Sequence, residues 1–177
     1  MNPQKHRSSK QEYYMNIARE VAKRATCMCA HFGAIIVRDD QIISTGYNGA
    51  PRHTKDCYEI GFCLRRKLGV KSGTQYELCR SVHGEQNAII NAARAGVSVL
   101  NGDLYLFGKK VMEGEEQLIK ALPCFICKKM ILNSGIKRVF GNDEEGNVCE
   151  YNVEDWVKEW AENDMINDTQ KYNANYK

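Results

Sequence analysis

Two short motifs constrain this chain more than any other feature, because each places metal-binding side chains at the start of a segment with helical spacing. The first is His83-Gly84-Glu85, and the second is Pro-Cys-Phe-Ile-Cys at residues 123–127. One imidazole and two thiols reach a single metal ion only if both segments begin at the same place. The sequence therefore requires a fold that brings these two helix starts together.

Zinc is the metal that this set of donors favours. It binds nitrogen and thiolate sulfur in a tetrahedral shell, and a catalytic site uses three protein ligands and leaves one position for water. His83, Cys124 and Cys127 supply three such ligands. The two cysteines are spaced to project from one face of a helix, Pro123 suits the helix entry, and the helix dipole favours thiolates. We therefore predict a catalytic zinc site.

Glu85 is the predicted catalytic acid–base. It follows His83 closely in the sequence and can stay off the metal. Zinc lowers the pKa of a bound water from about 15.7 towards roughly 7, and a nearby carboxylate can move protons between that water, a ring nitrogen and a departing amine. Taken alone, C-x-x-C also fits a structural zinc knuckle or a redox pair, and H-x-E occurs by chance. The two motifs together, each before a helical segment, favour catalysis.

Length and composition indicate a globular protein of ordinary type. The 177 residues suit a single domain, which we predict over residues 1–165, with a polar, disordered tail at 166–177. We find neither a membrane-spanning apolar run nor a secretory signal in residues 1–10, so we predict a cytoplasmic protein with no membrane partner. The net charge of +3, with basic residues scattered among 22 acids, disfavours a nucleic-acid partner.

The chain contains eight cysteines, which is a high number. A disulfide framework needs an oxidising compartment, so metal binding explains the cysteines better. Two belong to the motif already described. The other six are Cys27, Cys29, Cys57, Cys63, Cys79 and Cys149.

The spacing of apolar residues predicts alternating helices and strands. Helices are predicted at 11–25, 83–95, 124–133 and 153–161. Strands are predicted at 33–37, 42–47, 103–107, 136–140 and, as an edge strand, 148–151. Residues 48–80 are a long irregular stretch, and residues 108–122 a charged hairpin or surface loop. This order predicts a three-layer α/β/α fold with a mixed, roughly five-stranded sheet, and a site at one end of its strands.

Several segments resemble one enzyme family. H-x-E with P-C-x-x-C is the signature of zinc nucleobase deaminases. The sequence GAIIV at 33–37 resembles a first strand of the dCMP deaminase family, STGYNGAP at 44–51 resembles its G-Y-N-G-x-P segment, and HGEQNAI at 83–89 resembles its H-A-E-Q-N-A-I block. Over about residues 10–141 the chain resembles the deoxycytidylate (dCMP) deaminases of the cytidine deaminase-like superfamily. This resemblance implies a cytidine deaminase-like fold and zinc-dependent hydrolysis of dCMP to dUMP and ammonia, which supplies thymidylate synthesis.

The resemblance also implies roles for residues outside the zinc motifs. The side chain of Asn48 would hydrogen-bond the deoxynucleotide near its sugar, and a purely structural asparagine in a turn is the alternative. The backbone around Ala34 and Val82 would hold the edge of the base. Arg24 and Arg52 are candidates for the 5′-phosphate, which needs cationic donors, and both also fit ordinary surface charges.

Three departures or additions accompany the resemblance. Gly84 replaces the usual alanine of the family, at little cost in a helix start. The 108–122 segment is longer than in compact members, where it could shape subunit contacts or the mouth of the pocket. Relatives often form hexamers, and many are regulated by dCTP and dTTP. The resemblance therefore implies a homo-oligomer, with a hexamer and this regulation as the specific expectations.

Some members of the family carry a second, structural zinc. Cys27, Cys57, Cys63 and Cys79 would form a closed four-thiolate site of that kind. It would join the end of the first helix to the irregular stretch and to the residues before His83. Cys29 could replace one of the four, and free buried thiols remain the alternative.

Other functions also fit parts of the pattern. A deaminase of dCTP or cytidine would use the same zinc motifs. A nucleic-acid deaminase would accept a single-stranded or extruded base, which the modest net charge disfavours. A zinc-stabilised module that senses nucleotides without catalysis has no use for Glu85, so that residue favours an enzyme.

Overall fold

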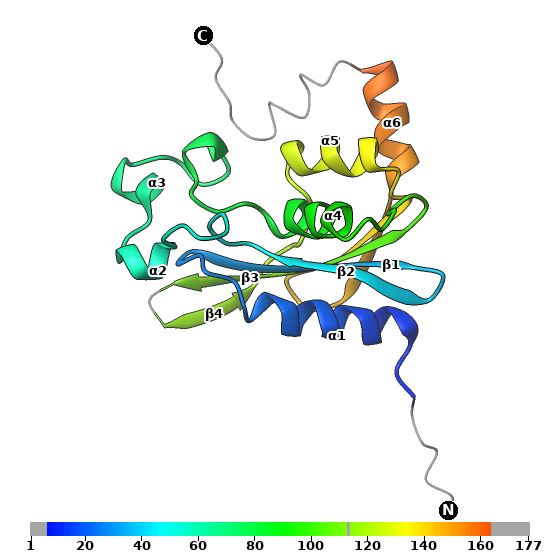
Figure 1. Cartoon of the computed structure of the whole chain (residues 1–177), viewed down its shortest axis with the longest axis horizontal. Coiled ribbons are helices and arrows are strands. Elements are labelled where there is room, and N and C mark those ends of the chain that lie inside the picture. The colour runs from blue at the N-terminus through cyan, green and yellow to red at the C-terminus, as the bar shows by residue number, and fades with distance from the viewer. Residues whose placement is uncertain (1–6, 113, 164–177) are drawn as a thin grey trace, which may run out of the picture.

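The computed structural model describes residues 7–112 and 114–163, which form a six-stranded mixed sheet (Figure 1). The strands are β1 (Ala30–Arg38), β2 (Gln41–Tyr47), β3 (Asp103–Met112), β4 (Glu115–Leu118), β5 (Arg138–Asn142) and β6 (Val148–Asn152). Their spatial order is β2-β1-β3-β5-β6, with β4 paired to β3. Strands β3 and β5 are parallel and the other pairs are antiparallel.

Helices cover both faces of the sheet, which confirms the predicted three-layer α/β/α arrangement. Helix α1 (Lys10–Ala22) lies on one face, and α4 (Gly84–Arg94), α5 (Phe125–Ser134) and α6 (Val153–Glu162) lie on the other (Figure 1). The irregular 48–80 stretch contains three short helical turns. They are α2 (Cys57–Ile60), α3 (Leu64–Lys67) and the 3₁₀ turn η1 (Tyr76–Leu78).

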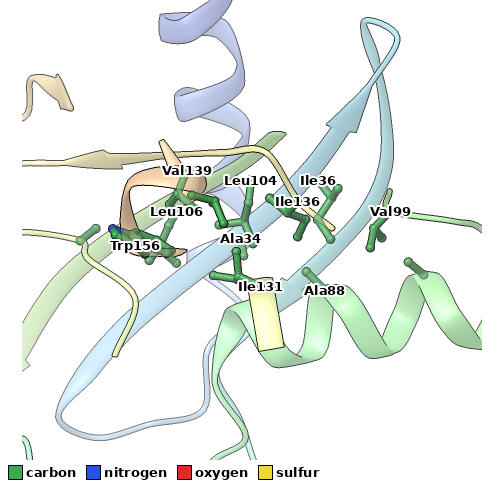
Figure 2. Packing of buried hydrophobic residues seen from close by; sticks show 13 residues of the cluster. Ala34, Ile36, Ala88, Val99, Leu104, Leu106, Ile131, Ile136, Val139 and Trp156 are labelled. Carbon is green, nitrogen blue, oxygen red and sulfur yellow. The ribbon is translucent and has the colours of Figure 1, made fainter. Parts of the chain in front are cut away.

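The continuous apolar run in β1 is explained by burial on both faces. Ala34 and Ile36 point to the α4 side, and Ile35 and Val37 point to the α1 side. Figure 2 shows the cluster on the α4 side, where residues of the strands meet residues of α4, α5 and α6. Its labelled members are Ala34, Ile36, Ala88, Val99, Leu104, Leu106, Ile131, Ile136, Val139 and Trp156.

The charged 108–122 segment supplies the sixth strand. Strand β3 runs to Met112, beyond the predicted end at residue 107, and returns as β4. Lysines at 109 and 110 interrupt the apolar pattern, so the spacing of apolar residues did not predict that the strand continues to Met112. The paired strands instead place Lys109 near Glu116, with an N–O separation of 2.5 Å. The segment is therefore a hairpin, one of the two predicted forms.

Helix α4 lies unusually close to β2. A Cβ atom added at Gly46 would overlap the backbone of α4 at Ala88 and Gly84. Hydrogen bonds reinforce the contact, since Ser44 Oγ donates to the Ala88 carbonyl at 2.6 Å and Asn87 Nδ2 donates to the Tyr47 carbonyl at 2.7 Å. Strand β2 therefore fixes the distance between the sheet and the first turn of α4.

No helix of the described residues is long and apolar enough to cross a membrane. The predicted disordered tail at 166–177 lies outside the described residues. The single-domain boundary at residue 165 stays a prediction.

Gly46→Ala tests the close contact between α4 and β2. The new methyl group would push the helix backbone away from the strand, and we expect a loss of about 1–3 kcal/mol of unfolding free energy. Urea denaturation measures this loss. Gly84→Ala is the matched control, because its Cβ would meet nothing closer than 3.4 Å. An equal loss in both variants would contradict the proposed constraint.

Candidate metal centre

The predicted ligands lie at the starts of two helices on the same face of the sheet. His83 is the N-cap residue of α4, Cys124 is the N-cap residue of α5, and Cys127 lies in the first turn of α5. The backbone N–H of His83 donates to Gln86 Oε1 at 3.0 Å, which fixes the entry to α4. Both helix dipoles therefore direct their positive ends at the cluster and favour thiolates there.

The three ligands converge to distances that fit zinc. Nδ1 of His83 lies 3.4 Å from Sγ of Cys124 and 3.4 Å from Sγ of Cys127. Tetrahedral coordination, with its usual Zn–N and Zn–S bond lengths, separates nitrogen and sulfur by about 3.6 Å. In the part of the chain that the structure describes, these residues are the one set of three or more His, Cys, Asp or Glu with ligand atoms within 4.8 Å of one another. The donor set and its spacing therefore fit the metal.

A hydrogen bond joins the two thiols. The bond donated by the Cys127 thiol lowers the pKa of Cys124 to about 4, and the same bond raises the pKa of Cys127. Burial opposes protonation of His83, but its bond with Cys124 and the charge of Glu85 leave the imidazole pKa above its usual value. A divalent cation would replace these protons, because thiolate and neutral imidazole are the metal-binding forms.

Glu85 lies beside the ligands but outside their set. Its side chain is in the first turn of α4, only 4% exposed, and contacts Cys127. Burial raises the pKa of the Glu85 carboxyl above its usual range. A buried carboxyl group with a raised pKa beside metal-binding side chains is a candidate to accept and return protons.

Asn142, at the end of β5, is a buried residue that the sequence reasoning missed. Its Oδ1 accepts from Gly108 N–H at 2.8 Å, and its Nδ2 donates to the carbonyls of Gly108 and Ile119 at 3.1 and 2.9 Å. The backbone N–H of Ala121 donates to the Asn142 carbonyl at 2.7 Å. These bonds fix the chain just before Cys124. A single asparagine after an apolar strand carries no signal that would predict this role.

The predicted substrate-binding residues have other contacts in the structure. Ala34 is buried in β1, and Val82 exchanges both backbone hydrogen bonds with Gly49. The Asn48 side chain accepts from Phe32 N–H at 2.7 Å and donates to the Ala30 carbonyl at 2.9 Å. Asn48 therefore anchors β1, and its contact with a sugar stays a prediction.

The two arginines chosen for the phosphate are both exposed. Arg52 donates to Asn91 Oδ1 at 2.8 Å, about two turns along α4 from His83. Arg24 lies just beyond the end of α1, and α1 is the helix on the opposite face of the sheet from α4. Neither position shows a contact with the metal cluster, so both assignments stay predictions.

The cysteines of the predicted structural site lie in one region. Burial and then the neighbouring thiols Cys27, Cys63 and Cys79 raise the pKa of Cys57 to about 11. Cys29 also belongs to this region, because its thiol bonds that of Cys63. Among the described residues, no three of these sulfurs lie within 4.8 Å of one another, whereas the ligand atoms of the His83 cluster do. The thiols are therefore neighbours, but their sulfurs are not arranged around a single metal position.

Comparisons with known proteins agree with this geometry. Residues 8–141 match the family model of the cytidine and deoxycytidylate deaminase zinc-binding region. The chain is 34% identical over 139 residues to the deoxycytidylate deaminase of Schizosaccharomyces pombe, across 78% of this chain. It spans 38% of that relative's length. It is also 32% identical over 133 residues to the deoxycytidylate deaminase of Mycobacterium phage D29, across 72% of this chain and 90% of the relative.

A solved structure supports the fold. The dCMP deaminase of the cyanophage S-TIM5, in complex with dCMP and dUMP, is similar to this chain with a TM-score of 0.56. The two are 24% identical, and the likeness covers 78% of this chain and 85% of that one. The predicted cytidine deaminase-like fold is thereby confirmed.

Proposed function

This chain belongs to the cytidine and deoxycytidylate deaminase family, and we propose that it hydrolyses dCMP to dUMP and ammonia. The observation that carries the proposal is the meeting of one imidazole nitrogen and two thiol sulfurs beside the buried carboxyl of Glu85. The names of the relatives support dCMP as the substrate. The dUMP product would supply thymidylate synthesis.

His83, Cys124 and Cys127 would hold the zinc ion. Zinc in such a site supplies a Lewis acid that lowers the pKa of water towards about 7. The open side of the cluster would receive the amino-bearing edge of the pyrimidine. The buried surroundings would exclude bulk water from the reacting groups and strengthen the electrostatic interactions there.

Glu85 would carry the protons of the reaction. Its carboxylate would take one proton from the attacking water, donate one to the ring nitrogen beside the reacting carbon, and help to protonate the departing ammonia. The burial that raises its pKa supports this role, because the proton must be accepted and released near neutral pH. The backbone around Ala34 and Val82 would orient the base.

Glu85→Gln tests the proton transfer. The amide preserves the size of the side chain but cannot carry protons, so we expect turnover of dCMP to fall by about 10²- to 10⁴-fold. Zinc bound per chain should not change. Ammonia release and elemental analysis measure the two quantities. Glu115→Gln is the control, because it removes an exposed carboxylate from β4. Retained turnover in Glu85→Gln would contradict the assigned role.

A comparison of substrates tests the nucleotide preference. We expect kcat/KM for dCMP to exceed that for cytidine by at least about tenfold, because a bound 5′-phosphate adds charge-assisted hydrogen bonds. Ammonia release from dCMP, CMP, cytidine and dCTP measures the preference. Equal activity on cytidine and dCMP would contradict a nucleotide-specific enzyme, and a preference for dCTP would identify the alternative substrate.

We also propose a second, structural zinc at Cys27, Cys57, Cys63 and Cys79. The gathering of these thiols supports it, as does the need of an irregular stretch for a cross-link. Cys29 is the alternative fourth ligand, because it contacts Cys63.

Counting zinc per chain tests the second site. We expect about two zinc ions in the wild type and about one in either Cys57→Ser or Cys124→Ser, because each variant opens one tetrahedral site. Elemental analysis of the purified proteins measures the number. Cys149→Ser, which alters a thiol in β6, is the control and should keep both ions. A wild-type ratio near one would exclude the structural zinc.

The protein is further proposed to act as a homo-oligomer, with a hexamer as the specific expectation. Exposed apolar side chains on the described surface support association, among them Ile90, Ile126 and Val157. Regulation by dCTP and dTTP and a cytoplasmic location stay predictions.

A further inference from the structure

A tyrosine ring packs against the imidazole of His83. Tyr76 belongs to the 3₁₀ turn η1, and its ring centre lies 4.9 Å from that of His83 at an interplanar angle of 83°. Nδ1 of the imidazole lies 3.4 Å from the sulfur of each of the two thiols. Metal-binding histidines are normally oriented by a hydrogen bond from the second ring nitrogen to an oxygen. At this site an aromatic edge-to-face contact restrains the ring.

Tyr76 is itself held by an arginine of the same irregular stretch. The guanidinium carbon of Arg65 lies 4.9 Å from the centre of the Tyr76 ring, which is a cation–π distance. The same guanidinium donates to the carbonyls of Lys71 and Thr74 at 3.1 and 2.5 Å. Arg65 thus joins α3 to the segment that leads into η1, and it fixes the ring that faces His83.

The tyrosine also lies close to the other groups of the centre. After burial, the charges of Cys124, Cys127 and Glu85 contribute to raising the pKa of the Tyr76 hydroxyl to about 12, which Arg65 opposes. The phenol is therefore neutral at physiological pH. This position makes Tyr76 part of the wall around the cluster.

We propose that Tyr76, supported by Arg65, is a positioning residue that holds His83 in the orientation for zinc binding. The inference deepens the proposed function, since it rests on zinc binding by His83, Cys124 and Cys127. It assigns a role in the metal centre to the 64–78 part of the irregular stretch. In this arrangement the Tyr76 ring, in contact with the Arg65 guanidinium, orients the histidine. At other zinc sites a hydrogen bond to an oxygen acceptor has that role.

Charge and support predict opposite effects for Arg65. Its guanidinium lies against the Tyr76 ring that faces His83, and a cation near a zinc ion disfavours metal binding by Coulomb repulsion. If charge were its only effect, Arg65→Ala would bind zinc more tightly. If Arg65 supports Tyr76, the same variant binds zinc more weakly, because the aromatic ring loses its restraint. The sign of the change therefore separates the two explanations.

The experiment measures zinc affinity by competition with a chromogenic chelator, using the full chain. Tyr76→Ala should weaken zinc binding about tenfold or more, which is the usual effect of losing an outer contact to a ligand histidine. Tyr76→Phe keeps the ring and should retain affinity within about twofold, since the contact is made by the ring and not the hydroxyl. Arg65→Ala should weaken binding by a smaller factor. Zinc bound at other sites is measured in the His83→Ala protein, and this amount is subtracted from the zinc bound by each variant.

Phe62→Ala is the matched control for damage to the irregular stretch. Phe62 forms a similar pair with Lys67, whose Nζ lies 4.5 Å from the ring centre, but it does not contact His83. We expect unchanged affinity in this variant. If Tyr76→Ala fails to fold, as circular dichroism would show, Tyr76→Leu replaces the ring with an apolar group and should show the same loss.

Wild-type affinity in the folded Tyr76→Ala or Tyr76→Leu protein would overturn the proposal. Tighter binding in Arg65→Ala would overturn the supporting role of Arg65, and equal losses in Phe62→Ala and Tyr76→Ala would reduce the effect to loop damage. The measurement requires no substrate. Failure of the wild type to deaminate dCMP would therefore contradict the proposed reaction and leave this test decisive.

Discussion

The metal centre depends on the contact between α4 and β2, where two backbones approach so closely that residue 46 has no room for a side chain. This contact sets the height of His83 and Glu85 above the sheet. Asn142 makes a separate set of bonds that fixes the entry to α5 and so the position of Cys124. The ligands belong to different helices, so the 3.4 Å separations require both constraints at once.

Four titratable groups are buried together at this centre, which makes proton transfer and metal binding possible and lowers the stability of the fold. An uncompensated buried charge destabilises a fold by several kcal/mol, and here a carboxyl, an imidazole and two thiols share one small volume. The hydrogen bond between the two thiols partly compensates this cost. A divalent cation compensates it more fully, which links metal binding to the stability of the fold. The same burial gives Glu85 its raised pKa.

Local patterns in the sequence were sufficient to predict the meeting of His83, Cys124 and Cys127 and the layers of the fold. The C-x-x-C spacing specified one face of a helix start, and the run at 33–37 specified a strand buried on both sides. Contacts between distant segments left no such pattern. Lys109 and Lys110 look like loop residues in the sequence, but both lie in β3 and pair with β4. Arg52 donates to Asn91, which only the folded chain brings near, and its phosphate contact stays a prediction. Tyr76 and Asn142 were missed for the same reason.

The bonds of Asn142 have a consequence for how this protein can vary. They tie Gly108 to Ile119 and therefore close the β3–β4 hairpin at its base. Surface hairpins of this kind tolerate insertions and deletions best when their ends are held by the scaffold. The hairpin can thus lengthen, shorten or acquire new surface chemistry over evolutionary time while Cys124 stays in place. The buried Asn142 amide therefore separates the hairpin from the position of Cys124.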